Sequence, residues 1–334
     1  MTETHPCDHQ NTLFLQDIPE MPDKSVLEIS KLMLETLSAR LSQRSSEAKR
    51  TFGFEYEFLP HRVLHMRDME NLINFFHTHG FKDHGGWLER GLLGVTFEPG
   101  GQVEYQSPPL PSGHGPLFEE TLARIAELNH DIEKKLGIRY IAVPYMEGRQ
   151  KAPLLLTSPR YKKMHERFAA CDRRGLEMMK GTAAIHLHVA VLKIQELPVL
   201  YRLLCEMSHM EMMRMSSDRR NIWDQTDPSR CGLPVCMEKC DTPLSLLYGL
   251  VGFAMNAVDL ETRKPFRYTA ENENPTDHFK RFLDHFTTIF TDVRLNMKGG
   301  TLELRTLDSK PMDEFRKSWT TFTAMIEARM SMGR

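Results

Sequence analysis

The sequence predicts a single α+β domain preceded by an N-terminal tail and helix. Strand-like and helical runs alternate from Thr51 onward, and no Gly-, Ser- or Pro-rich linker divides them. Four strand-like runs carry acidic or imidazole side chains at alternate positions, which places those side chains on one face of a strand. At 334 residues the chain is long enough for one large domain. We therefore assign residues 1–49 to the N-terminal extension and residues 50–334 to the domain.

The elements follow from hydrophobic periodicity. Ser25 followed by Glu28 resembles a capping box, and apolar residues recur at helical spacing from Val26 to Leu41. This helix is expected to pack on the domain. Strands are predicted near 52–59, 93–98, 101–107, 138–144, 182–192, 292–297 and 301–306. Helices are predicted near 67–79, 115–136, 161–180, 194–215, 242–258, 276–290 and 311–331.

The composition is that of an ordinary globular protein, with 40% hydrophobic and 26% charged residues. The formal net charge of −2 comes from 43 basic and 45 acidic residues, so electrostatics gives no reason to expect binding to nucleic acid or to an anionic membrane. No apolar run approaches the roughly 18 residues that span a bilayer. The N-terminus also lacks the features of a signal peptide. We therefore expect a cytoplasmic protein.

The six cysteines do not resemble a disulfide framework in a chain of this size. Cys231, Cys236 and Cys240 are spaced C-x4-C-x3-C, which matches no common zinc pattern and has no fourth ligand nearby. Free thiols are the preferred interpretation. A zinc site and a regulatory disulfide are the alternatives.

Acidic side chains recur on the predicted strands. Alternation within residues 53–58 sends Glu55 and Glu57 to one face and the aromatic residues to the other. A strand with one solvated face is the alternative explanation. A Pro-Gly-Gly turn then delivers Glu98 and Glu104 near one spot, because glycine permits a tight turn. Clustered carboxylates repel one another unless a cation separates them, so the pattern predicts a site for divalent cations and the phosphates they carry.

Histidines and arginines complete the candidate site. His186 and His188 share one face of an otherwise apolar strand, and either a ligand role or a core role fits them. The stretch 217–232 is rich in Arg, Asp and Asn and is predicted to be an ordered loop over the site, with a plain surface loop as the alternative. Arg305, two residues from Glu303, faces the same way and is placed to reach a phosphate. Because Walker A and kinase motifs are absent, any nucleotide chemistry must come from the carboxylate sheet.

Together these segments resemble the glutamate–cysteine ligase family of the plant and proteobacterial type, within the glutamine synthetase-like carboxylate–amine ligases. The resemblance covers roughly residues 50 to 325. Its most specific pieces are Glu-Pro-Gly-Gly-Gln-x-Glu and Thr-Thr-Ile-Phe-x-x-Val-Arg. The matching segments, in family order, are 53–57, 97–104, 160–161, 175–179, 182–189, 219–232, 285–295 and 302–305.

The resemblance implies a strongly curved, mostly antiparallel sheet that forms a glutamine synthetase-like catalytic funnel with outer helices. ATP and Mg²⁺ ions would lie inside the funnel. The residues implied to hold the metals are Glu55, Glu57, Glu104, His186 and Glu303. The residues implied to bind phosphates or the substrate carboxylate are Arg219, Arg230 and Arg305, and His188 is expected at the nucleotide.

The implied reaction has two steps and uses only small-molecule substrates. The γ-carboxylate of glutamate attacks the γ-phosphate of ATP, which gives an acyl phosphate and ADP, and an amine then displaces phosphate. A cysteine acceptor would place the chain in glutathione biosynthesis. However, this chain has His186 and His188 where the plant-type pattern has Gln and Asn, which loosens the branch assignment. It is also shorter than most members between the helices near 242–258 and 276–290, a region that helps to shape the amine pocket, so another amino acid or amine stays open. A phosphotransferase without ligation and a non-catalytic nucleotide-binding relative are the alternatives.

Overall fold

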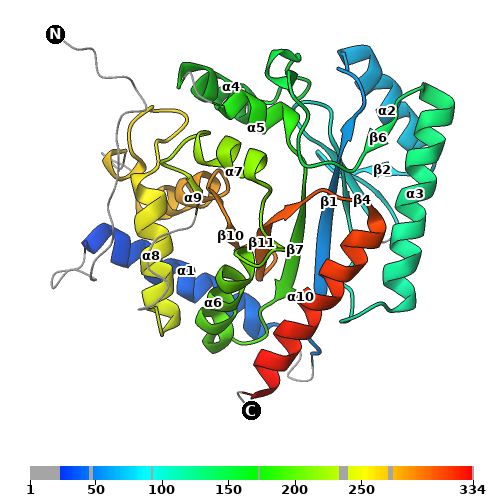
Figure 1. The fold of residues 1–334 in the computed structure, drawn as a ribbon. Helices are drawn as coiled ribbons and strands as arrows, with labels where there is room; N and C mark the ends of the chain where they lie inside the picture. The colour runs from blue at the N-terminus through cyan, green and yellow to red at the C-terminus, as the bar shows by residue number, and fades with distance from the viewer. Residues whose placement is uncertain are drawn as a thin grey trace, which may run out of the picture.

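A computed structural model of the protein describes residues 23–44, 48–91, 93–171, 174–232, 240–269 and 274–332. Within these residues, nine strands form one open antiparallel sheet at the centre of the molecule (Figure 1). Eight of them follow the order β10 (Val293–Asn296), β11 (Thr301–Asp308), β7 (Ala184–Ala190), β1 (Phe52–Pro60), β5 (Val103–Gln106), β4 (Leu93–Phe97), β3 (Leu88–Arg90) and β2 (Lys82–Asp83). The ninth, β6 (Tyr140–Ile141), pairs with the end of β1. The predicted antiparallel α+β architecture is confirmed.

Ten α-helices surround the sheet in the described part of the chain. They are α1 (Lys24–Ser42), α2 (Met66–Thr78), α3 (Pro116–Leu136), α4 (Pro159–Ala170), α5 (Gly175–Gly181), α6 (Leu197–Ser208), α7 (Ser217–Asp224), α8 (Pro243–Asn256), α9 (Pro275–Phe286) and α10 (Met312–Met332). A short parallel pair, β8 (Cys231–Gly232) with β9 (Phe290–Thr291), lies apart from the main sheet. No helix in these ranges is long and apolar enough to cross a membrane.

The aromatic face of β1 determines which way the acids point. Phe54 packs edge-on against Phe315 of α10 with 5.1 Å between ring centroids, and α3 and α10 cover this side of the sheet (Figure 1). Phe118 of α3 stacks on Trp319 of α10 at 5.0 Å. Because alternate residues of a strand point to opposite faces, Glu55 and Glu57 are directed away from this core. The predicted facing of β1 is confirmed.

Some predicted boundaries were wrong. The helix expected over 161–180 is two helices, α4 and α5. The second begins at Gly175, which packs closely on the first, since a Cβ there would lie 2.8 Å from Phe168. The helix expected over 194–215 is a 3₁₀ turn followed by α6, which ends at Ser208. The first half of the stretch expected to be a loop over 217–232 is helix α7.

The N-terminal helix also differs from expectation at its first turn. Its N-cap is Asp23, whose carboxylate accepts the backbone N–H of Ser25 at 2.9 Å and that of Val26 at 3.4 Å. The predicted Ser25–Glu28 capping box is therefore wrong, because an Asp two residues earlier satisfies the same donors. Beyond its cap, α1 packs along α8 as part of the same hydrophobic core.

The cysteines can be placed only in part. Cys231 in β8 is a buried free thiol, and Cys240 is also buried. Cys236 lies outside the described residues, so the grouping of the three stays a prediction. Cys171 takes part in a disulfide, which the cysteine count did not predict.

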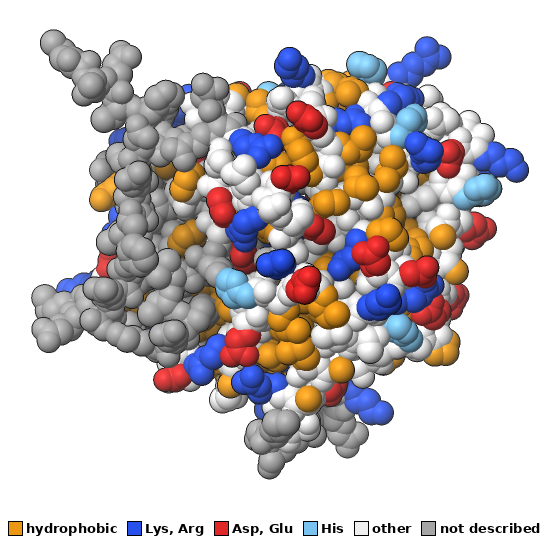
Figure 2. Space-filling view, viewed as in Figure 1, with side chains coloured by type: hydrophobic (Ala, Val, Ile, Leu, Met, Phe, Trp, Pro, Cys, Tyr) orange, Lys and Arg blue, Asp and Glu red, His pale blue; other side chains and the backbone are white. Residues whose placement is uncertain are grey.

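The visible surface carries mixed charge. On the face shown in Figure 2, basic and acidic side chains alternate over the described part, with hydrophobic side chains between them. This mixture agrees with the near-zero net charge of the whole sequence.

Candidate active site

Strand register gathers the acidic side chains. Glu57 on β1 lies directly opposite Glu104 on β5. Glu55, two residues earlier on β1, lies opposite His186 on β7. Because directly opposed residues of an antiparallel pair lie side by side, three neighbouring strands place their polar groups at one point of the sheet.

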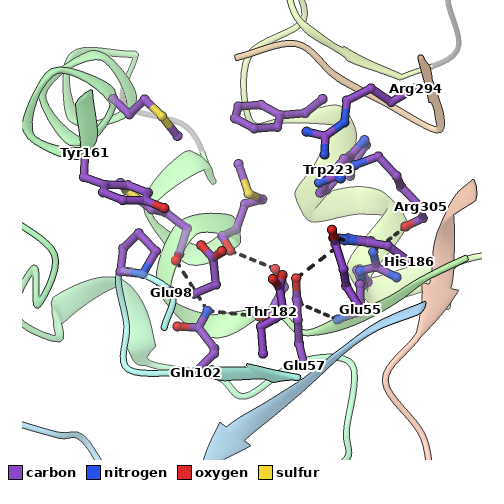
Figure 3. Close-up of a pocket in the computed structure, with 18 of the residues that line it drawn as sticks. Glu55, Glu57, Glu98, Gln102, Tyr161, Thr182, His186, Trp223, Arg294 and Arg305 are labelled. Atoms are coloured by element: carbon purple, nitrogen blue, oxygen red, sulfur yellow. Dashed lines mark hydrogen bonds and ion pairs between the residues drawn. The ribbon is translucent and has the colours of Figure 1, made fainter. Parts of the chain in front are cut away.

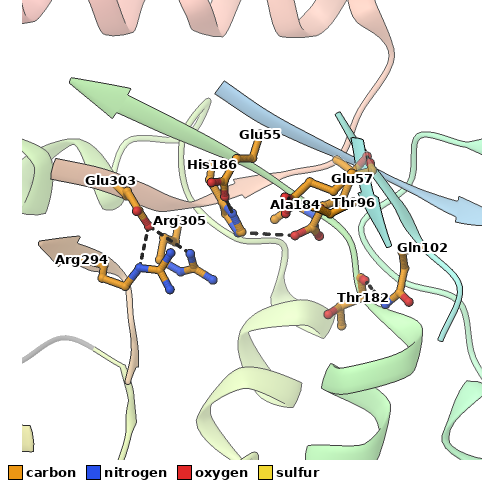
Figure 4. A network of polar contacts seen from close by, with 12 residues as sticks. Glu55, Glu57, Thr96, Gln102, Thr182, Ala184, His186, Arg294, Glu303 and Arg305 are labelled. Atoms are coloured by element: carbon orange, nitrogen blue, oxygen red, sulfur yellow. Dashed lines mark hydrogen bonds and ion pairs between the residues drawn. The ribbon is translucent and has the colours of Figure 1, made fainter. Parts of the chain in front are cut away.

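Three of these side chains form a group with the spacing of metal ligands. One ligand atom from each of Glu55, Glu104 and His186 lies within 4.8 Å of the others. His186 Nδ1 is 2.8 Å from Glu55 Oε2, and its Nε2 is 3.7 Å from Glu57 Oε1 (Figure 4). With the proton assigned to Nδ1 for the bond to Glu55, Nε2 is left as an acceptor facing the carboxylates.

The buried carboxyl groups have too few cationic side chains beside them to balance their charge. Burial raises the pKa of Glu104 well above its usual range, and the charges of Glu55, Glu98 and Glu57 raise it further. Burial also raises the pKa of Glu98 to about 8 and that of Glu57 to about 7. Burial lowers the pKa of His186 to about 3, so this imidazole is neutral. A cluster of oxygen ligands and one neutral imidazole fits a divalent cation.

The Pro-Gly-Gly turn brings Glu98 to the same cavity, as predicted. Gly101 has φ +86°, and its N–H donates to Glu98 O at 2.8 Å. Gln102 fastens the turn, since its Oε1 accepts from Gly100 N at 2.9 Å and its Nε2 donates to Thr182 O at 3.0 Å. A Cβ on Gly100 would lie 2.4 Å from the carbonyl oxygen of Lys180, so the turn rests against the end of α5.

Substituting Gly100 with alanine is expected to destabilise the protein by about 1–3 kcal/mol, because the added methyl group meets backbone rather than a movable side chain. Urea denaturation measures the loss. Gly115→Ala serves as the control, since its Cβ would be 3.7 Å from the nearest heavy atom. Equal stability of the two variants would contradict the tight contact.

Basic side chains line the opposite end of the cavity. Glu303 on β11 is fully buried and accepts from Arg294 Nε at 2.7 Å and Arg305 Nη1 at 3.2 Å (Figure 4). It also accepts from Asn296 Nδ2 at 3.0 Å. Although burial opposes it, Arg294 and His188 lower the pKa of Glu303 to about 2. Glu303 is thus an ionised carboxylate that holds two arginines at the cavity. Its predicted role as a metal ligand stays a prediction.

His188 and Arg219 lie beside this group. His188 lies between Glu55 and Glu303, with Nε2 3.3 Å from Glu55 Oε1 and Nδ1 3.8 Å from Glu303 Oε1. Arg219 on α7 lines the cavity, although its terminal nitrogens donate to Asp308 and to backbone carbonyls. Its Nε has no hydrogen-bond partner within the described residues.

Arg230 is not among the residues that line this cavity. Its side chain is fully buried, and its Nε donates to Asp227 Oδ2 at 2.9 Å while Nη1 donates to Thr288 Oγ1 at 2.9 Å. Arg167 Nε also donates to Asp227, at 3.1 Å. These contacts support a structural role for Arg230. Its predicted role in binding phosphate stays a prediction.

The substitution Arg230→Gln is expected to lower the free energy of unfolding by about 3–5 kcal/mol, because it removes the buried ion pair with Asp227 together with the hydrogen bonds that Arg230 donates to Thr288 and Val258. Burial opposes ionisation, but Arg230 and Arg167 lower the pKa of Asp227 to about 2. The stabilisation by ionised Asp227 is therefore present above about pH 4 and lost as pH falls toward 2. Urea denaturation at several pH values measures both effects. An unchanged stability with a raised KM for ATP would instead support the phosphate role.

Helices close the cavity from above. The cavity measures about 230 Å³, and its apolar side, opposite the carboxylates, is the roof. The roof consists of Tyr161, Met164, Met178, Met179, Trp223 and Phe290. Figure 3 shows Tyr161 and Trp223 facing the acids across the opening. No role was predicted for these side chains, because methionines and aromatics at helical spacing are typical of ordinary core.

The residues predicted to form the site thus separate into those that line this cavity and those that do not. The cavity brings together Glu55, Glu57, Glu104, His186, Arg219 and Arg305. Glu303 and His188 lie behind this layer, and Arg230 lies elsewhere. Glu98 lines the cavity, as the Pro-Gly-Gly turn predicted. Arg160 and Arg294 also line it, although they were predicted only as parts of the segments that carry the family resemblance.

A comparison with protein families identifies the family of the chain. The model of glutamate-cysteine ligase family 2 matches residues 51–332. This range includes every element from β1 to α10 and leaves α1 outside. Among curated proteins, none matches the chain.

Proposed function

Because the chain belongs to glutamate-cysteine ligase family 2, we propose that it is an ATP- and Mg²⁺-dependent ligase that joins the γ-carboxylate of glutamate to an amine through a γ-glutamyl phosphate. The observation that carries this proposal is the division of one cavity into an acidic floor and a basic end. Phosphoryl transfer between two anions requires both: oxygen ligands for cations and arginines for the transferred group.

The metal would be held by Glu55, Glu104 and His186, with Glu57 and Glu98 beside them. When bound, Mg²⁺ neutralises charge on the phosphate oxygens of ATP. Arg305 and Arg219 present buried Nε groups without protein partners in the described residues, and these can donate to a phosphoryl oxygen or a substrate carboxylate. Their positions are maintained by Glu303 and Asp308 respectively.

The roof has a chemical use in this scheme. An acyl phosphate is lost to hydrolysis whenever water reaches it before the amine does. The methionine and aromatic side chains above the acids are mostly buried themselves and exclude water from the reacting carbon. We place the reaction in the cytoplasm, where ATP and free amino acids are supplied.

The test measures ADP release and γ-glutamyl products with glutamate, ATP, Mg²⁺ and a panel of amines that includes cysteine and hydroxylamine. Hydroxylamine is small enough to capture an acyl phosphate without a shaped acceptor pocket. ADP release that requires both glutamate and an amine supports the ligase. A stable phosphorylated product without amide would favour a phosphotransferase, and ATP binding without any ADP would favour a non-catalytic relative.

A further inference from the structure

A second cavity adjoins the first and is larger. It measures about 560 Å³, and Arg160 and Arg294 line both cavities. Its wall comes from five segments: α1, the start of α4, the end of α9, strand β10 and the β10–β11 turn. The acid cavity measures about 230 Å³, and the two arginines that line both cavities make the second one a candidate to hold part of a substrate of the same reaction.

Helix α1 completes the second cavity. It contributes Thr36 and Arg40, and Arg40 also donates to the carbonyl oxygen of Lys298 in the β10–β11 turn. One turn later, Arg44 Nη2 donates to Gly299 O at 2.9 Å. The helix therefore holds this turn in place. Helix α1 lies outside the residues that match the family model, whereas the rest of the cavity wall lies within them.

The second cavity has an excess of positive charge. Arg40, Arg160 and Lys298 are exposed, and no carboxylate of the described residues forms an ion pair with any of them. Arg160 donates only to the carbonyl oxygen of Thr287, at 3.0 Å. Asp284 is the one acidic side chain in the wall as the structure describes it. Unpaired cations from three elements around one cavity favour a ligand with an anionic group.

The remainder of the wall is partly apolar. Its apolar side chains are Leu283, Phe286, Leu295 and Met297, which lie beside the polar Thr36, Thr287 and Asn296. Phe286 and Leu295 are buried, while the other two apolar side chains are partly buried and extend the apolar surface toward the opening. The ligand that fits this wall has an apolar body as well as its anionic group.

We propose that the second cavity binds the acceptor substrate, and that this acceptor is an amino acid or short peptide with a free carboxylate and an apolar side chain larger than that of cysteine. The inference rests on the proposed function. ATP and glutamate are common to the chemistry of the family and are expected to be held by matched residues. The acceptor is the substrate that the ligase chemistry leaves open, and the second cavity offers it cationic and apolar side chains outside the acid cavity.

The reaction step is then complete in atoms and charge. The acceptor carboxylate lies against Arg40, Arg160 and Lys298, and its uncharged amine reaches into the acid cavity past the shared arginines. The amine nitrogen attacks the γ-acyl carbon of γ-glutamyl phosphate and forms the C–N bond. The C–O bond to phosphate breaks, phosphate leaves with the electron pair, and the nitrogen loses a proton to solvent.

The test compares acceptors in the full-length protein. Leucine, methionine and phenylalanine, and dipeptides that begin with them, are expected to give kcat/KM values at least tenfold above those of cysteine and of isopentylamine, which lacks the carboxylate. Arg40→Gln and Lys298→Gln are each expected to raise KM for the preferred acceptor about tenfold, the effect of losing one charge-assisted hydrogen bond. KM for ATP and the rate of hydroxamate formation should not change. Arg40→Lys should restore much of the loss, and Lys31→Gln, on an exposed part of α1 away from the cavity, is the control.

The outcomes separate the two proposals. Hydroxamate formation together with preference for cysteine or for isopentylamine would overturn the acceptor inference and leave the ligase function standing. A rise in KM for ATP in Arg40→Gln would assign the cavity to the nucleotide and also overturn the inference. Absence of hydroxamate and of glutamate-dependent ADP release in the parent protein would overturn the proposed function, and the inference with it.

Discussion

Replacing Glu104 with glutamine is expected to lower kcat by about 10²–10³-fold while the metal-free protein becomes at least as stable as the parent. Glu104 supplies one of the three grouped ligand atoms, and its buried charge is opposed by three neighbouring carboxylates. A glutamine side chain has the same shape. Its amide oxygen can still accept from Thr96 Oγ1 and Gln106 Nε2, which now donate to Glu104 at 2.9 and 3.0 Å.

The expected change in stability follows from the pKa of Glu104. A carboxyl whose pKa is raised on folding costs stability above its unfolded value of about 4.3, and the cost grows as pH rises toward the folded pKa. The glutamine variant escapes this cost, so its Tm in EDTA should fall less than that of the parent between pH 5 and 8. Mn²⁺ titration and ADP release measure the loss of binding and of turnover. Glu89→Gln, on β3 of the same sheet but outside the cavity, is the control. Parent-like Mn²⁺ affinity in Glu104→Gln would remove Glu104 from the metal site.

The direction of the acidic side chains on β1 was predictable, because alternate residues of a strand point to opposite faces and the aromatic face must be the buried one. Glu55 and Glu57 could not point inward without exposing Phe54 and Tyr56 to water. Which residue of a partner strand would lie opposite each acid was not predictable, since register depends on tertiary pairing. Only the structure shows that Glu55 lies opposite His186 and that Glu57 lies opposite Glu104.

The two arginines predicted from the 217–232 stretch show where sequence reasoning ends. The family resemblance implied for both a role in binding phosphates or the substrate carboxylate, and both lie in one polar, arginine-rich segment. Helix α7 buries Arg219, Ile222 and Trp223 along one side, at a helical spacing that the surrounding polar residues hide. Arg219 therefore reaches the cavity, whereas Arg230 follows the helix and pairs with buried Asp227. The residues around Arg219 and Arg230 in the sequence are similar in type, and the two arginines differ only in the residues that they contact in the fold.

The roof and Arg294 were missed for a related reason. Arg294 lies opposite Glu303 across the β10–β11 pair, so its role depends on a strand pairing that is not visible along the sequence. The methionines of α4 and α5 have the same periodicity as a buried helix face. A core position and a cavity wall differ in what lies across from them, and periodicity does not record that difference.

Substituting Arg305 with glutamine is expected to reduce kcat by about 10³-fold with little loss of stability. Arg305 lines the cavity, and its Nε has no protein partner in the described residues. Glu303 would keep Arg294 at 2.7 Å and Asn296 at 3.0 Å, so the buried carboxylate would stay neutralised without Arg305. ADP release and urea denaturation measure the two quantities in the same preparation.

Arg294 provides the matched comparison, because it binds the same carboxylate from the neighbouring strand. In Arg294→Gln, Glu303 retains only Arg305 among its arginines, at 3.2 Å, so the charge of Arg305 is drawn toward Glu303 and away from the cavity. Both variants should therefore lose activity, but only Arg305→Gln leaves a space at the cavity that a small cation can fill. Added guanidinium is expected to restore part of kcat in Arg305→Gln and none in Arg294→Gln. Normal turnover with a lowered Tm in Arg305→Gln would instead mean that Arg305 serves to neutralise Glu303 and does not contact the transferred phosphoryl group.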